Sequence, residues 1–237
     1  MSSPRIVIAT PLRGMQVSAV HYASCWALMG ADLGIIDPQI LVDDDLVRAR
    51  SRAVRLFLET TAEYLLFWDS DIEGSASALR GMTASNVDCI AAAYPKKKMD
   101  KWGQSRDFAL YTEGERIPFE GDAVPVPAVG LGFMLLSRRL LESMVKWFDD
   151  DYHFYDGADR TVALFSLILA VDSTGTVRLW PEDYSFCKRV WSIGRKVHLY
   201  TGPGSPLAHV GDHVYRGRAE DVHPRHRTTK DDDDPVR

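Results

Sequence analysis

The sequence predicts a single α/β domain with a mixed, mostly parallel central sheet flanked by helices. Short apolar runs such as Tyr64–Trp68 are each followed at once by polar or turn residues, as buried parallel strands are. Segments in which apolar residues recur with helical spacing alternate with these runs, which is the pattern of layered α/β proteins. A length of 237 residues is suited to one large domain of this class.

Composition limits the classes of partner and compartment. Hydrophobic residues make up 46% and charged residues 26%, which is ample for a buried core, and the net charge of −5 argues against stable nucleic-acid binding. Cys25, Cys89 and Cys187 have no paired spacing, so neither a disulfide framework nor a zinc site is indicated. The N-terminus lacks the apolar core of a signal peptide, and no run approaches the roughly 18 apolar residues of a membrane helix. We expect a soluble, cytoplasmic protein with no transmembrane segment.

The first half of the chain alternates expected strands and helices. The strands are expected over residues 5–10, 33–42, 64–68 and 88–94, and the helices over 17–29, 46–61 and 74–82. Pro38 lacks a backbone N–H, so the second strand should be irregular or lie at an edge. The carboxylates of Asp43–Asp45 should cap the helix that follows them.

The second half begins with a stretch, residues 100–118, that reads as loop or peripheral hairpin. Further elements are an edge or crossover strand (123–129), a strand (133–137), a helix (138–148), a helix opened by Pro181 and a last core strand (197–200). Residues 149–159 are acidic and aromatic and are expected to form a surface loop that could contact an acceptor, and 161–171 could be strand or helix. We expect the domain to span 1–215, with a charged, mobile tail over 216–237.

The most informative motif is the pair of carboxylates Asp69 and Asp71, directly after the apolar run. Ligands bind at the carboxyl ends of strands in open α/β sheets. The two carboxylates are two positions apart, which places both side chains on the same side if the backbone stays extended. Two such carboxylates form half a shell for a hard divalent cation that would in turn hold a phosphate. The alternative is a strand that ends in an ordinary acidic turn.

Two further features lie at expected element boundaries. Glu182 and Asp183 open a helix, and His209 follows a late strand. Mg²⁺ or Mn²⁺ takes carboxylate oxygens, and Mn²⁺ also accepts imidazole nitrogen. A helix-start Asp that binds no metal could serve as a general base. Taken singly, the acidic pair is more often a cap, and the histidine a packed or surface residue.

Taken in order, these motifs resemble those of the GT-A fold glycosyltransferases, particularly the family 2-like group and its compact bacterial and phage-borne members. The resemblance covers about residues 5–215. The segments that carry it are R-I-V-I-A-T-P, L-V-R-A-R-S-R, L-L-F-W-D-S-D-I, A-A-A-Y-P-K-K-K, V-G-L-G-F-M-L-L-S-R, P-E-D-Y-S-F-C-K-R and L-A-H-V-G-D. It implies a GT-A, Rossmann-like sheet that binds a nucleoside-diphosphate sugar, UDP- or GDP-linked.

The resemblance also implies roles for individual residues. A Mn²⁺ or Mg²⁺ ion would be held by Asp69, Asp71 and His209, with Asp71 the more direct ligand. Asp183, with Glu182 beside it, would be the base that makes transfer to an acceptor hydroxyl inverting, although some relatives retain configuration. Ser51 stands where the family usually has Asn, which puts the role of Arg50 in doubt. The implied donor-binding residues are Thr10, Pro11, Arg13, Arg50, Asp69, Ser70, Lys97, Gly130 and Gly132. The acceptor would be a glycan, a glycolipid or a protein, and a homodimer is possible.

Two other classes stay open. A nucleotidyltransferase that makes nucleotide sugars shares the metal and the sheet but usually has a Gly-rich loop after the first strand, of which Thr10–Gly14 is a poor version. A non-catalytic nucleotide- or carbohydrate-binding module on the same fold has no need of the acidic residues at positions 69, 71 and 183. A zinc hydrolase is disfavoured because no His/Cys pair has ligand spacing.

Overall fold

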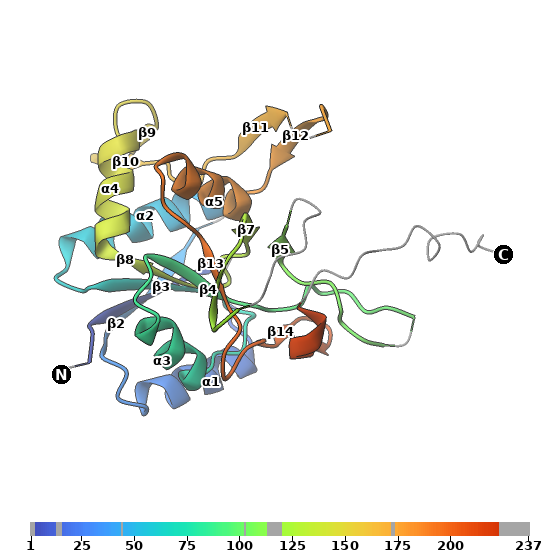
Figure 1. Ribbon diagram of the computed structural model, residues 1–237. Helices are drawn as coiled ribbons and strands as arrows, with labels where there is room; N and C mark the ends of the chain where they lie inside the picture. The colour runs from blue at the N-terminus through green and yellow to red at the C-terminus, as the bar shows by residue number, and fades with distance from the viewer. Residues whose placement is uncertain are drawn as a thin grey trace.

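A seven-stranded mixed sheet forms the centre of the computed structural model (Figure 1), which describes residues 3–12, 16–43, 45–101, 103–112, 120–171 and 174–222. The strands follow one another in the order β2 (Ile35–Val42), β1 (Ile6–Leu12), β3 (Tyr64–Trp68), β8 (Phe133–Ser137), β4 (Cys89–Ala92), β13 (His198–Tyr200) and β6 (Ala123–Pro125). β1 is parallel to β2 and β3, and β4 is parallel to β13, whereas β8 and β6 run antiparallel to their neighbours. The predicted mostly parallel α/β sheet is confirmed.

Helices cover both faces of the sheet (Figure 1). α2 (Leu46–Glu59), α4 (Arg138–Phe148) and α5 (Glu182–Ser192) lie on one face, and α1 (Ala19–Met29) and α3 (Ala76–Ala84) on the other. β3 is a continuous apolar run because its side chains are buried on both faces of the sheet. Leu65 and Phe67 pack into the core on the α2 face, while Leu66 and Trp68 pack into the core on the α1 face. A strand buried on both faces has no position for a polar side chain.

Smaller elements surround the sheet. They are the hairpins β9 (His153–Asp156) with β10 (Asp159–Val162), β11 (Ile168–Val171) with β12 (Val177–Trp180) and β14 (His209–Val210) with β15 (Val214–Tyr215), the pair β5 (Leu110–Tyr111) with β7 (Ala128–Val129), and the short helix η1 (Ala219–Asp221). The surface loop expected over residues 149–159 is therefore wrong in part, because β9 and β10 form a hairpin there. β2 confirms the edge position expected for residues 33–42. Of the range 123–129, only β6 lies at the other edge of the main sheet, whereas β7 pairs with β5 in a separate sheet.

Local capping agrees with the sequence. The Asp45 carboxylate accepts hydrogen bonds from the backbone N–H groups of Val47 (2.9 Å) and Arg48 (3.2 Å), which confirms its role as the N-cap of α2. Pro181 precedes α5, which carries Glu182 and Asp183 in its first turn. Across the described parts of the chain, no helix combines the length and apolar character that a membrane crossing requires.

The strand directions gather the candidate residues at one edge of the sheet. β1, β3, β4 and β13 all end there, and antiparallel β8 begins there, as its pairing of Phe133 with Trp68 shows. The segment Gly130–Gly132 before β8 therefore reaches the same edge as Asp69 and Asp71. The described chain continues beyond residue 215 to Val222, whose side chain is buried. The domain boundary expected at residue 215 stays a prediction.

Candidate functional site

The two carboxylates after β3 lie in a tight turn. The Asp69 backbone N–H donates to the Gly132 carbonyl (2.9 Å), and the Ile72 N–H donates back to the Asp69 carbonyl (3.1 Å). The Trp68 indole Nε1–H closes the turn on the Ile72 carbonyl at 2.9 Å. The expectation of extended backbone through Asp71 is wrong, because the chain bends as soon as β3 ends. The two carboxylates consequently have different partners.

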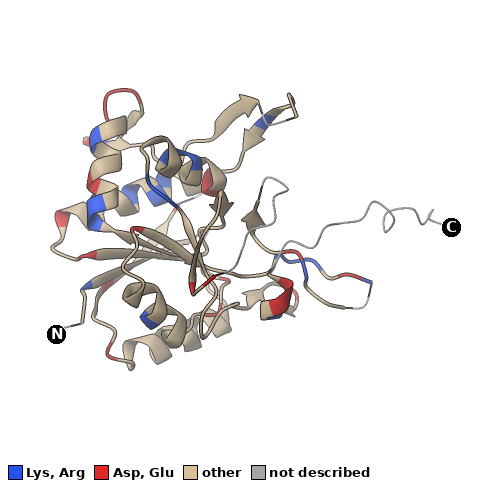
Figure 2. Ribbon diagram, in the orientation of Figure 1, with Lys and Arg blue, Asp and Glu red and all other residues tan. Residues whose placement is uncertain are grey.

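Asp69 is bound by a buried arginine. Arg50 Nη2 lies 2.9 Å and 3.1 Å from the two carboxylate oxygens of Asp69, and the Arg50 side chain is only 2% exposed. Figure 2 shows several basic segments along α2, but Arg48 and Arg52 turn outward to other carboxylates. Burial raises the pKa of Asp69, and the Arg50 guanidinium opposes that rise. Arg50 thus binds the turn that follows β3 through Asp69.

Asp71 lies between two basic side chains. Its Oδ2 atom is 2.6 Å from Lys97 Nζ and 3.3 Å from His209 Nε2. Burial raises the pKa of Asp71, but the hydrogen bonds and charges of these partners outweigh it and bring the pKa down to about 2. Asp71 is therefore ionised throughout the neutral range and is held as an acceptor.

Backbone hydrogen bonds hold His209 beside Asp71, although 138 positions separate them in the sequence. The Val210 N–H donates to the Asp71 carbonyl (2.7 Å), and the Glu73 N–H donates to the Ala208 carbonyl (2.9 Å). The imidazole Nδ1 lies 2.9 Å from the Pro95 carbonyl oxygen. A carbonyl oxygen can only accept, so Nδ1 carries a proton and donates to Pro95, and Nε2 is the ring nitrogen that faces Asp71.

This arrangement is suited to binding a cation whose coordination shell would be completed by substrate oxygens. A metal-binding histidine typically donates its other N–H to a backbone carbonyl, as His209 does to Pro95. Within the described ranges, no three His, Cys, Asp or Glu side chains are grouped as a metal site, since Asp69 faces Arg50. Mg²⁺ is commonly held by one or two carboxylates together with phosphate oxygens and water. Asp71 and His209 therefore fit the protein part of such a site.

A cleft of about 600 Å³ opens beside this cluster. The charged or titratable side chains that line it include Asp71, Lys96, Lys97, Asp183, Tyr184 and His209. The cleft thus brings together residues from the turn after β3, the segment after β4, the start of α5 and β14. Four elements far apart in the sequence contribute to one cavity, and four of the residues expected to act there line it: Asp71, Lys97, Asp183 and His209.

Asp183 is the titratable acid of this cleft. Burial and the neighbouring negative charge of Glu182 raise its pKa to about 6, although a hydrogen bond from the Tyr184 N–H (2.7 Å) favours the ionised form. A carboxylate whose pKa is close to neutrality is ionised at pH 7 and yet accepts a proton readily. Ser185 fixes the start of α5, because its hydroxyl donates to the Trp180 carbonyl and accepts from the Ile168 N–H, both at 3.0 Å.

Tyr94 is a site residue that the sequence analysis missed. It lines the cleft from the end of β4, and its buried hydroxyl accepts a hydrogen bond from the Gly132 N–H at 3.1 Å. A Cβ atom at Gly130 would lie 2.1 Å from the Tyr94 hydroxyl oxygen, and one at Gly132 would lie 2.9 Å from it. The two glycines therefore make room for Tyr94, and their predicted contact with a donor stays a prediction. The sequence feature that could have identified Tyr94 is a tyrosine at the end of an apolar run, at the edge of the sheet where ligands bind.

Three aromatic rings also gather near Asp183 and were missed. The ring of Tyr111 lies 4.9 Å from that of Trp180 and 5.9 Å from that of Tyr184, which lines the cleft. Tyr111 and Trp180 come from β5 and β12, so no local sequence pattern connects them. Through Tyr184, this cluster flanks the cleft. The sequence instead predicts that a loop of residues 149–159 would contact an acceptor.

Other predicted donor contacts have different positions. Thr10 and Pro11 are buried residues of β1, paired with Ile40 and Leu41, so the expectation that a loop begins at Thr10 is wrong and the strand continues to Leu12. Ser70 accepts a hydrogen bond at its carbonyl from the Ser18 N–H (3.2 Å). Arg13 lies outside the described residues. Thr10, Pro11 and Ser70 do not line the 600 Å³ cleft.

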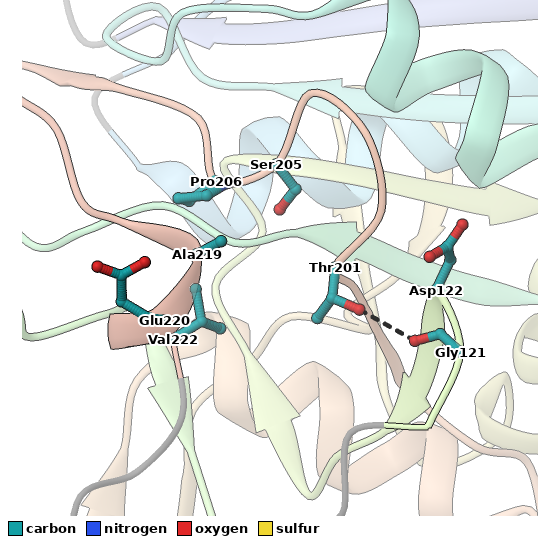
Figure 3. A pocket seen from close by; sticks show the side chains of 8 residues that line it. All are labelled: Gly121, Asp122, Thr201, Ser205, Pro206, Ala219, Glu220 and Val222. Atoms are coloured by element: carbon teal, nitrogen blue, oxygen red, sulfur yellow. Dashed lines mark hydrogen bonds between the residues drawn. The ribbon is translucent and has the colours of Figure 1, made fainter.

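A second cleft, of about 420 Å³, lies beyond the end of β13 (Figure 3). Asp122, Thr201, Ser205 and Glu220 contribute its polar side chains, and the Thr201 hydroxyl donates to the Gly121 carbonyl at 3.2 Å. Among the described residues, it shares no lining residue with the first cleft and contains none of the site residues predicted from the sequence.

Comparisons with known proteins give distant likenesses. No protein-family model matches the chain, and no curated protein matches it in sequence. Among solved structures, it is similar to the A197 protein from STIV, with a TM-score of 0.49 and 19% identity over 90% of this chain and 98% of that one. It is also similar to CMP:2-keto-3-deoxy-manno-octonic acid synthetase complexed with CTP, with a TM-score of 0.41 and 9% identity over 83% of this chain and 89% of that one. At these values the likenesses carry no argument about function.

Proposed function

We propose that this protein is a metal-dependent glycosyltransferase that moves a sugar from a nucleoside-diphosphate sugar to an acceptor hydroxyl. The observation that carries the proposal is the composition of the first cleft. Asp71, His209 and Lys97 offer positions for a cation and for anionic oxygens, and Asp183, whose pKa is raised to about 6, lines the same cavity. Transfer from a diphosphate needs both functions within reach of one substrate.

The residues divide the chemistry between them. Lys97, which lines the cleft, is placed to bind diphosphate oxygens, and Asp71 and His209 are the residues that would hold Mn²⁺ or Mg²⁺. Such an ion, when bound, would neutralise charge on the departing diphosphate. Asp183 would accept the proton of the acceptor hydroxyl while that oxygen bonds to the anomeric carbon. The bond between that carbon and the diphosphate oxygen breaks at the same time, which inverts the configuration.

Arg50 acts in this scheme by fixing the shape of the site. Its contact with both oxygens of Asp69 keeps that carboxylate beside the turn and leaves Asp71 to face the cleft. Two buried nitrogens of Arg50, Nε and Nη1, have no hydrogen-bond partner among the described residues. Buried donors of this kind are usually satisfied by water or by a ligand. A ribose or sugar hydroxyl at Asp69 is consistent with that need.

A thermal-shift panel tests the proposal directly. UDP- and GDP-sugars should raise the melting temperature in the presence of Mn²⁺, since a ligand that binds only the folded state stabilises it. Asp71→Ala should abolish the Mn²⁺-dependent part of the shift, whereas Asp150→Ala, an exposed acidic control, should retain it. A full shift in the Asp71 variant would contradict the metal assignment.

Product analysis separates the competing classes. Release of a nucleoside diphosphate with glycosylated acceptor supports the transferase. Release of pyrophosphate from a nucleoside triphosphate and a sugar phosphate would identify a nucleotidyltransferase. Binding with no turnover of any donor would identify a binding module. Asp183→Asn should bind the donor and lose transfer, and transfer at the unaltered rate would rule out Asp183 as the base.

A further inference from the structure

We infer that Lys97 competes with the cation for the Asp71 carboxylate. A bound diphosphate would draw Lys97 away and so free Asp71 to bind the cation. This inference rests on the proposed function and concerns the order of events in the same cleft. The starting observation is that Lys97 Nζ lies 2.6 Å from Asp71 Oδ2, the same oxygen that faces His209 Nε2 at 3.3 Å. An ammonium group in contact with that oxygen fills the position that a divalent cation would take, and it neutralises the negative charge that would attract the cation.

Of the two partners of Asp71, the lysine is the one that can move. The His209 side chain is 16% exposed and is fixed by the Pro95 carbonyl and by the backbone bonds on either side of it. The Lys97 side chain is 39% exposed and reaches Asp71 through a flexible four-carbon chain. Repulsion by an entering cation would therefore displace Lys97 while His209 stays in place.

A diphosphate gives the displaced ammonium group a new partner. Lys97 lines the 600 Å³ cleft, so an anion bound there lies within range of its side chain. The neighbouring Lys96 is engaged with Asp107 at 3.2 Å, which leaves Lys97 as the lysine that a diphosphate would draw away from Asp71. Transfer of Lys97 to the phosphate oxygens frees the Asp71 carboxylate at the moment when those oxygens become available as further metal ligands.

The small number of side chains available as metal ligands also supports this inference. Asp71 and His209 are two ligand-type side chains, and Asp69 is bound to Arg50, so the described residues alone make a weak metal site. Phosphate oxygens must supply the remaining ligands. Metal and diphosphate should therefore bind with positive coupling, and by linkage each raises the affinity of the other by the same factor.

The test measures Mn²⁺ affinity by calorimetry, with and without saturating UDP or GDP, in the natural protein, Lys97→Met and Lys96→Met. The natural protein should bind Mn²⁺ weakly alone and roughly tenfold more tightly with the nucleotide, within the usual range of coupling. Lys97→Met should bind Mn²⁺ alone several-fold more tightly and show a smaller nucleotide effect. Lys96→Met should bind Mn²⁺ alone with the affinity of the natural protein, because Lys96 pairs with Asp107 and not with Asp71.

Lys97→Arg provides a second variant that keeps the charge and should keep weak Mn²⁺ binding in the absence of nucleotide. If Lys97→Met leaves the affinity for Mn²⁺ alone unchanged while the natural protein binds metal and nucleotide together, the competition is refuted and the proposed function stands. If the natural protein binds neither Mn²⁺ nor any nucleotide, both are refuted. Equal Mn²⁺ affinity with and without nucleotide in the natural protein would also overturn the inference.

Discussion

Replacing Asp183 with asparagine should stabilise the folded protein at pH 8 while removing its proposed base. Burial and the charge of Glu182 raise the pKa of Asp183 from 3.8 to about 6. The unfolded chain therefore loses this proton at a lower pH than the folded chain does, and the free energy of unfolding falls as the pH rises between these values. Above pH 6 the full penalty for the buried charge applies.

The magnitude follows from the size of the pKa difference. A difference of roughly two pH units corresponds to about 3 kcal/mol at pH 8, and the same linkage gives about 1 kcal/mol at pH 4.5. Asparagine retains an oxygen that can accept the hydrogen bond from Tyr184 N–H. It loses the favourable interaction of a carboxylate with the start of α5, which is about 0.5 kcal/mol. The net gain for Asp183→Asn should be ~2.5 kcal/mol at pH 8, where the carboxylate is ionised. At pH 4.5 the folded-state carboxyl is protonated and has no such interaction to lose, so the gain should be ~1 kcal/mol.

Urea unfolding at the two pH values measures this difference. Asp150→Asn, an exposed change at the end of α4, is the matched control and should be nearly neutral at both. A loss of stability in Asp183→Asn at pH 8 would refute the reasoning. An equal gain at pH 8 and pH 4.5 would refute it as well, because the gain would then not come from the ionised carboxylate.

Two further changes test the surroundings of the site. Glu182→Gln removes one of the causes that raise the pKa of Asp183, so the lower midpoint of a pH–activity profile should move to below pH 6, and an unmoved midpoint would contradict that cause. Gly130→Ala should cost about 1–3 kcal/mol in urea unfolding, because its Cβ would lie 2.1 Å from the Tyr94 hydroxyl oxygen. Tyr94→Phe removes that atom, so the double variant should recover part of the loss, whereas strictly additive losses would mean that another contact is responsible.

The parts of the fold that local patterns encode could be predicted from the sequence. β3 is recognisable because a strand buried on both faces must be apolar throughout, and the start of α2 because Asp45 is a good N-cap. Asp183 was placed at the start of a helix for the same kind of reason. The raised pKa of that residue could not be predicted, since it depends on burial by elements remote in the sequence.

The parts of the site that long-range contacts create were harder to predict. The bend after Trp68 depends on the Gly132 carbonyl, which lies more than sixty residues away and overrides the extended backbone expected through Asp71. The contact between Asp71 and Lys97 depends on where the segment after β4 turns. Tyr94 was overlooked because, within an apolar run, a tyrosine reads as one more core residue. Its hydroxyl group gains a role only when β8 brings Gly132 to it.

The position of β8 between β3 and β4 has a consequence for how the protein is assembled during synthesis. The first hundred residues contain β1 to β4, yet β3 and β4 are neighbours only through a strand that ends at Ser137. The nascent sheet is therefore incomplete until that strand has left the ribosome, and His209 reaches Asp71 later still. Because no contiguous half of the chain contains the whole cleft, ligand binding at the cleft reports that the chain has folded from Asp71 through His209.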